Sequence, residues 1–146
     1  GGGLHYVCRK FYQHKPIMHM RKVIVIDSAK REVYEAQVGE YTDIYPLLGE
    51  QVTCFACPVQ FNDSDGLFVD DEGLYNDFEG GYIMEDWSYP ICGNGVICGQ
   101  DEEGESADVQ MSVDEVRSMV HWVSKERCLE WQQIALNGGG FKIVTW

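Results

Sequence analysis

Four of the cysteines have a spacing that could support metal or redox chemistry. Cys54 and Cys57 form a CxxC pair, and Cys92 with Cys98 could complete a set of four thiolate ligands. The second pair has five residues between its members, whereas structural zinc sites usually have about two to four. The first pair lies in a strand-like run, where an offset of three directs the side chains to opposite faces. We therefore expect buried free thiols, with a zinc site and a redox pair as alternatives, and we assign no metal and no cofactor.

The acidic segment FNDSDGLFVDDE resembles a calcium-binding loop in part. Asp63, Asp65, Gly66 and Glu72 fall at positions 3, 5, 6 and 12 of an EF-hand loop. Position 1 is Phe61, which has no ligand atom, and the flanking segments read as strands where that motif needs helices. An Asp-Gly pair between two strand-like runs instead indicates the turn of a hairpin. We expect an acidic hairpin turn that binds divalent cations weakly at most.

Paired carboxylates and one histidine are the other candidates for catalysis. Acids at 70–72 and at Glu103 and Glu105 lie in polar, glycine-flanked loops, so burial that would raise a pKa for acid catalysis is not expected. His121 precedes Cys128 by seven residues, which on a helix is a rise of roughly 10 Å and too far for a hydrogen bond. The GxSxG, phosphate-loop and HExxH motifs do not occur. We assign no catalytic residue and expect a protein that is not an enzyme.

The elements that must position these side chains are mainly strands. The capping box Ser112–Glu115 begins an amphipathic pattern of period 3.6, which predicts one long helix that ends at Asn137 and its following glycines. Apolar runs and turn residues predict a short helix at 44–48 and strands at 22–27, 31–38, 51–61, 66–70, 81–84, 94–99 and 141–145. This order predicts an α+β fold, in which the short helix and the long C-terminal helix pack on one face of a mostly antiparallel sheet.

Acidic side chains dominate the middle of the chain. The 146 residues carry 11 Lys and Arg against 24 Asp and Glu, a net charge of -13. From Glu32 to Val116, 85 residues include 21 acids and no Lys, Arg or His. Phosphate contacts need Lys or Arg, so this region is excluded as a conventional nucleic-acid-binding surface.

The first 19 residues differ from the rest, since they hold three basic side chains, three histidines and no acid. We expect residues 1–19 to be an N-terminal extension or a cloning remnant and residues 20–146 to be a single acidic domain. No segment has the apolar run of a signal peptide, or the roughly 18 apolar residues of a membrane span. Cysteines without a signal peptide suggest a reducing compartment, so the expected location is the cytoplasm.

Five segments follow one another along the chain: MRKVIVID, YTDIYPLLG, LFVDDEGL, GNGVICGQDEEG and SVDEVRSMV. In this order they resemble the DUF3846 family, small domains of phages, plasmids and other mobile elements. The similarity covers about Met20 to Val123, and its most specific pieces are DDEGL at 70–74 and GQDEEG at 99–104. The chain departs from the family pattern at its N-terminal piece and at 122–146. The resemblance implies a mobile-element setting, and with it the cytoplasm of a bacterial host cell. It transfers no catalytic role to any residue.

Charge and resemblance together predict an acidic interaction protein from a phage or mobile element. We expect an anti-defence inhibitor that imitates DNA and binds the basic, nucleic-acid-binding surface of a host protein, such as a nuclease, without binding nucleic acid or a membrane itself. The expected partner-binding residues combine loop acids with one aromatic side chain: Asp70, Asp71, Glu72, Asp77, Glu79, Glu85, Asp86, Trp87, Asp101, Glu102, Glu103 and Glu105.

Three alternatives remain open from the sequence. The acidity could serve only solubility. The chain could be a small-molecule or nucleotide-binding domain, enzymatic or not, with a pocket near Tyr82, Trp87 and Tyr89, although no Lys or Arg lies near these residues to hold a phosphate. It could also form a homo-oligomer through its long helix.

Overall fold

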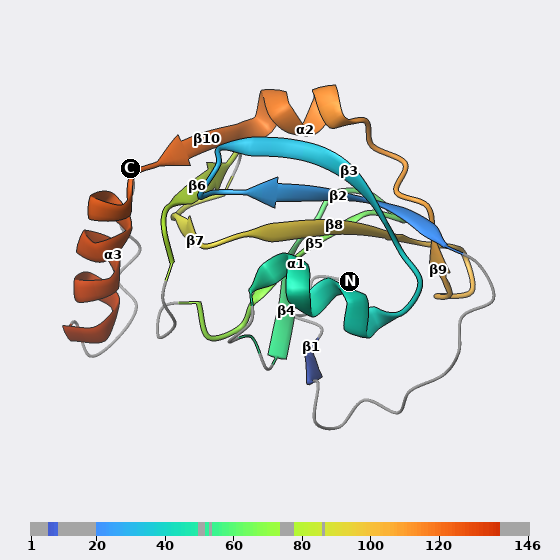
Figure 1. The fold of residues 1–146 in the computed structure, drawn as a ribbon, viewed down its shortest axis with the longest axis horizontal. Helices are drawn as coiled ribbons and strands as arrows, with labels where there is room; N and C mark the ends of the chain where they lie inside the picture. Colours follow the sequence, from blue (N-terminus) through green and yellow to red (C-terminus); the bar gives the residue numbers. More distant parts are fainter. Residues whose placement is uncertain are drawn as a thin grey trace.

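The structure is a computed structural model and describes residues 6–8, 20–49, 52, 54–73, 78–85 and 87–137. Its main element is a seven-stranded antiparallel sheet with the order β1-β4-β5-β8-β2-β3, in which β9 pairs with the end of β8 (Figure 1). The expected α+β class with a mostly antiparallel sheet is confirmed. The strands are β1 (Tyr6–Cys8), β2 (Arg21–Asp27), β3 (Glu32–Val38), β4 (Cys54–Gln60), β5 (Gly66–Asp70), β8 (Gly95–Gln100) and β9 (Ser106–Ala107).

Strand β2 is buried on both faces of this sheet. It lies between β3 and β8, with Ile24 and Ile26 in the core of one face and Val23 in the core of the other. A strand covered on both sides has a continuous apolar sequence, which explains the run KVIVID. The neighbouring β3 is the edge strand, and its exposed Glu32 and Glu35 protect that edge from pairing with another chain.

A short helical segment covers one face of the sheet. The 3₁₀ turn η2 (Tyr41–Asp43) leads into α1 (Ile44–Leu48), where the sequence predicted a short helix. Its side chain Tyr45 is fully buried and its ring centroid lies 5.0 Å from that of Phe55 on β4. Gly49 ends the helix with φ at 146°, a conformation that side-chain-bearing residues rarely adopt.

The expected long C-terminal helix is present, but it begins at Lys125 rather than after Ser112, because the structure divides this segment. Helix α2 (Val113–Met119) is followed by strand β10 (Val120–Val123) and then by helix α3 (Lys125–Asn137). Strand β10 pairs with β6 (Gly81–Met84), which also pairs with β7 (Ile91–Cys92), so these three strands form a second sheet.

The residues of β10 explain why the chain leaves the helix there. The segment Val-His-Trp-Val is β-branched and aromatic, and these residue types favour strands. Its pairing with β6 satisfies the backbone while Val120 and Val123 remain buried, as they would be on a helix of the same period. Ser124 then begins α3, because its hydroxyl accepts a hydrogen bond from the Arg127 amide at 3.2 Å.

The capping box at the start of α2 is confirmed. The Ser112 hydroxyl accepts from the Glu115 amide at 3.1 Å, and the Glu115 carboxylate accepts from the Ser112 amide at 3.1 Å. Val116 packs from α2 into the same core as Ile24, on the face opposite α1. The helices therefore lie on both faces of the main sheet rather than on one, and α3 packs beside the small sheet at one end (Figure 1).

Candidate functional site

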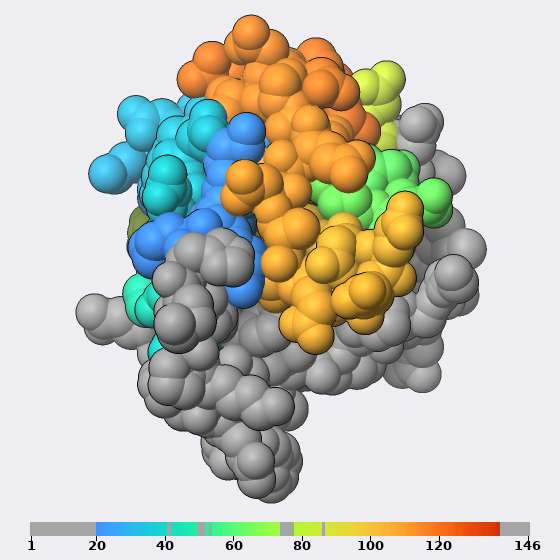
Figure 2. All heavy atoms as spheres, turned by 90° about the vertical axis from the view of Figure 1, so that its right-hand side faces the viewer, coloured from blue at the N-terminus to red at the C-terminus, as the bar shows by residue number. Residues whose placement is uncertain are grey.

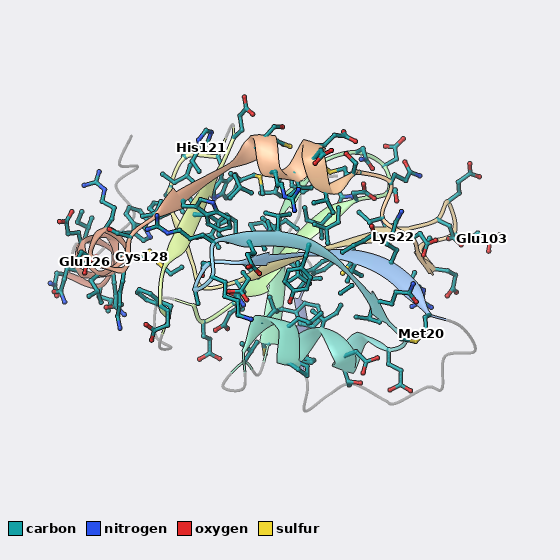
Figure 3. All side chains as sticks on the ribbon, turned by 45° about the horizontal axis from the view of Figure 1, so that its top comes forward. Met20, Lys22, Glu103, His121, Glu126 and Cys128 are labelled. Atoms are coloured by element: carbon teal, nitrogen blue, oxygen red, sulfur yellow. The ribbon has the colours of Figure 1, made fainter. Side chains whose placement is uncertain are left out.

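A run of exposed acids lies on the hairpin that joins β8 to β9, residues 101–105, called here the acidic hairpin. The Asp101 carboxylate accepts hydrogen bonds from the amides of Glu103 and Glu105, both at 2.9 Å. The Asp101 amide also donates to the Glu105 carbonyl at 2.8 Å, and Gly104 adopts φ of 81°. The loop is therefore fixed by its own hydrogen bonds, and Figure 3 shows Glu103 projecting from its tip. Glu102 is exposed beside it.

Two acids that the sequence did not predict to bind a partner lie beside this hairpin. Exposed Asp63 is in the β4–β5 turn, which is held against β8 because the Gln100 amide donates to the Ser64 carbonyl at 3.1 Å. Exposed Asp108 follows β9, and its carboxylate accepts from the Lys22 amide at 2.8 Å. These two residues and the acids of the hairpin form one surface, called here the acidic end: Asp63, Asp101, Glu102, Glu103, Glu105 and Asp108.

The acids of the β5 turn lie at the opposite end of the sheet. Strands β5 and β8 are antiparallel, with Gly66 opposite Cys98 and Val69 opposite Gly95, so β5 ends where β8 begins. Residues 70–72 are therefore separated from the acidic hairpin by the length of β8, roughly 20 Å at about 3.4 Å per residue. The structure does not bring together the two acidic groups that the sequence pointed to.

Asp71 is the carboxyl group at this second end whose pKa departs from its usual range. Partial burial, then the neighbouring charges of Glu72 and Asp70, raise the pKa of Asp71. The Glu72 amide meanwhile donates to the Asp70 carboxylate at 2.9 Å, which holds the turn together. The three adjacent acids thus repel one another.

Acidification is expected to relieve this repulsion and stabilise the fold slightly. A carboxyl group with a raised pKa binds its proton more readily in the folded chain, so its destabilising effect disappears as the pH falls through the folded-state pKa. Asp71→Asn should therefore be more stable than the wild type at about pH 7, and the difference should shrink towards about pH 4. Urea unfolding at several pH values measures this, with Glu126→Gln on α3 as the exposed control. A difference that does not change with pH would contradict the prediction.

The remaining expected partner-binding residues are dispersed. Exposed Glu79 carries its carboxylate 3.8 Å from the Lys125 ammonium of α3, and Glu85 is exposed after β6. Trp87 is half-buried and packs against the main core, with its Nε1 buried and without a hydrogen-bond partner among the described residues. Asp77 and Asp86 lie outside the described residues.

The aromatic residues of this region hold the small sheet to its neighbours. Tyr82 is fully buried, so it is not available to line an open pocket. The rings of Trp87 and Tyr89 lie 5.1 Å apart, and Tyr89 stacks on Trp131 of α3 with centroids 5.4 Å apart. These contacts attach α3 to the fold, so Trp87 and Tyr89 pack at the margin of the core.

Asp65 is a buried carboxylate that links two distant parts of the chain. It is wholly inaccessible and accepts hydrogen bonds from the amides of Gln110 at 2.9 Å and Met111 at 2.8 Å and from the Ser64 hydroxyl at 3.0 Å. Figure 2 shows the segment before α2, in orange, between blue β2 and the green β4–β5 turn. Asp65, which matched position 5 of the calcium-binding loop, therefore points into the protein and accepts hydrogen bonds from backbone amides.

The cysteines do not assemble into a four-thiolate set. Cys57, Cys92, Cys98 and Cys128 are free, whereas Cys54 is disulfide-bonded, so the expectation of free thiols is wrong for Cys54. A hydrogen bond with Cys128, together with burial, raises the pKa of Cys92, and the same bond lowers that of Cys128. Among the described residues, no three His, Cys, Asp or Glu side chains are grouped so that they could hold a metal ion.

A cavity of about 220 Å³ lies beside the acidic end, where β2 and β5 begin and β8 ends. The sequence analysis did not find it, since its walls come from separate strands. Burial raises the pKa of Cys98 to about 12, with a smaller increase from Cys57 and against the attraction of Arg21. This thiol is therefore protonated at neutral pH and is not a nucleophile. The residues that line the cavity include Arg21, Cys57, Gly66, Phe68, Cys98 and Ser106.

The fold and the site define a small acidic α+β domain with a fixed, exposed acidic hairpin. The chain belongs to the family described as Domain of unknown function (DUF3846), whose model matches residues 20–121. The match begins directly before β2 and ends within β10, so α3 lies beyond it. No curated protein and no solved structure matches the chain. In the part of the chain that the structure describes, no helix is long and apolar enough to cross a membrane.

Proposed function

We propose that this protein is an acidic interaction protein of a phage or other mobile element, and that its acidic end binds a basic, nucleic-acid-binding surface of a host protein. In that role it acts as an anti-defence inhibitor and is not an enzyme. The acidic hairpin is the observation that carries the proposal, because it presents exposed Glu102, Glu103 and Glu105 on a loop that Asp101 holds in place.

The rigidity of the hairpin favours binding. Ordering a flexible loop on association costs free energy, and a loop that its own hydrogen bonds already fix avoids much of that cost. Gly104 contributes by donating from its amide to the Asp101 carbonyl at 3.0 Å, which closes the turn. The carboxylates of the tip are therefore presented to a partner without rearrangement.

The charge of the hairpin is not neutralised within the described part of the chain. Ion pairs there engage acids on other elements: Glu35, Glu79, Asp114 and Glu130. Clustered charges of one sign create a field that speeds association with an oppositely charged surface and weakens with salt. A basic surface that evolved to hold phosphates fits such a field.

Capture from a bacterial lysate tests the proposal with two variants of equal charge. The first changes Glu102, Glu103 and Glu105 to Gln and keeps Asp101, which the loop needs. The matched control changes exposed Glu32, Glu126 and Glu130 to Gln, so both variants lose the same net charge.

Wild type and the control variant are expected to retain a nucleic-acid-binding protein at about 50 mM salt, and to lose it at about 500 mM salt or when double-stranded DNA competes. The hairpin variant should bind at least about tenfold more weakly, since three close charge contacts are removed. Equal binding by the two variants would contradict the proposal, and so would a captured protein that DNA does not displace.

A further inference from the structure

The cavity beside the acidic end is lined by an arginine whose Nε–H has no hydrogen-bond acceptor among the described residues. The Arg21 Nε atom is buried, and no described residue accepts its hydrogen bond. Figure 3 labels Met20 and Lys22, which flank this residue at the start of β2. Arg21 as a whole is half-buried, and its Nε–H is the donor that lies inside the protein without an acceptor. A buried N–H without an acceptor is unfavourable, and an anionic oxygen that accepts from it removes that cost.

We propose that this cavity binds a small monocarboxylate with an apolar body, and that the ligand's carboxylate pairs with Arg21. This site goes beyond the proposed function and does not depend on it. Guanidinium groups offer parallel N–H donors that match the two oxygens of a carboxylate. The other walls are mainly apolar and suit a hydrocarbon body: Val23, Val38, Ile44 and Phe68.

A glycine creates part of the space. Gly66 on β5 pairs with Gln60 of β4 and with Cys98 of β8, and Cys57 belongs to the β4 bulge. A Cβ atom at Gly66 would come within 2.7 Å of the Cys57 sulfur, so any side chain there would crowd this wall of the cavity. The volume of about 220 Å³ is below the roughly 300 Å³ at which drug-sized pockets begin, which limits the ligand to on the order of ten heavy atoms.

The charges around the cavity limit the ligand to one negative charge. Arg21 is the basic side chain of its lining, and Glu40 is the acidic one, with its carboxylate accepting from the Thr42 hydroxyl at 3.3 Å. The net charge of -13 repels anions at a distance, so the apolar body must supply much of the affinity. A nucleotide phosphate, which carries more charge, is disfavoured.

Titration of the full chain with benzoate, followed by amide NMR signals, tests the site. Benzoate should shift the signals of Gly66, Phe68 and Cys98 saturably, with a dissociation constant of about 1 mM or tighter. Benzamide has the same shape without the charge and should bind at least about tenfold more weakly. This comparison uses the wild-type protein, so it does not depend on the folding of a variant.

Two arginine variants complete the test. Arg21→Met should reduce benzoate affinity at least about tenfold and leave the fold intact, because it removes a buried donor without an acceptor. Arg127→Met on α3 changes the net charge equally and should leave benzoate affinity unchanged. Absence of saturable shifts at the cavity would overturn the proposal, as would equal binding of benzamide or equal binding by Arg21→Met. Loss of binding in Arg127→Met would also overturn it, by showing a general charge effect.

Discussion

Asp65→Ala is expected to lower the free energy of unfolding by about 3 to 5 kcal/mol. The carboxylate is wholly buried, and its removal leaves the partly buried amides of Gln110 and Met111 without their acceptor. Each buried donor that loses its partner costs about 1 to 3 kcal/mol. Because these amides directly precede α2, the change should loosen the contact between the β4–β5 turn and that helix.

Urea unfolding followed by circular dichroism measures this loss, with Asp63→Ala as the matched control. Asp63 belongs to the same turn but is exposed, so its removal should change the free energy of unfolding by no more than about 0.5 kcal/mol. Asp65→Asn should fall between the two, since an amide oxygen still accepts a hydrogen bond but its NH₂ group faces donors. If Asp65→Ala were no less stable than Asp63→Ala, the anchoring role would be wrong.

Features set by neighbouring residues could be predicted from the sequence. The capping box before α2 formed as expected, because its hydrogen bonds join residues three apart. The β5 and β6 strands have the predicted bounds, 66–70 and 81–84, since turn residues and apolar runs mark them locally. The exposure of the hairpin acids also followed from composition, as charged side chains in a glycine-containing loop stay in water.

Features set by pairing between distant segments could not be predicted in this way. The apolar period that predicted one helix also fits a helix followed by the strand Val120–Val123, and only the pairing with β6 decides between them. The separation of the acids at 70–72 from the hairpin results from the antiparallel pairing of β5 with β8. The cavity at Arg21 needs several strands in register around Gly66, which no local pattern shows.

Gly95→Ala is the second change expected to have a large effect. Gly95 begins β8, and an added Cβ atom would collide with the hydroxyl of Tyr82 and lie 2.8 Å from Cδ1 of Leu67. Both neighbours are fully buried, so neither can move away without disturbing the core. Overpacking of this kind costs about 1 to 3 kcal/mol and occasionally more, and we expect a loss of about 3 kcal/mol in the free energy of unfolding.

Tyr82→Phe should rescue part of that loss, and this rescue tests the cause. The Tyr82 hydroxyl is buried and has no hydrogen-bond partner among the described residues, so its removal alone should stabilise the fold by about 1 kcal/mol. In the double variant the added methyl group gains the space of the hydroxyl, and a double-mutant cycle should show favourable coupling above about 1 kcal/mol. Gly39→Ala meets a flexible methionine instead, with its Cβ 3.3 Å from the Met20 sulfur, and should show no coupling to Tyr82→Phe. Additive effects in the Gly95 cycle would show that the two groups do not compete for this space.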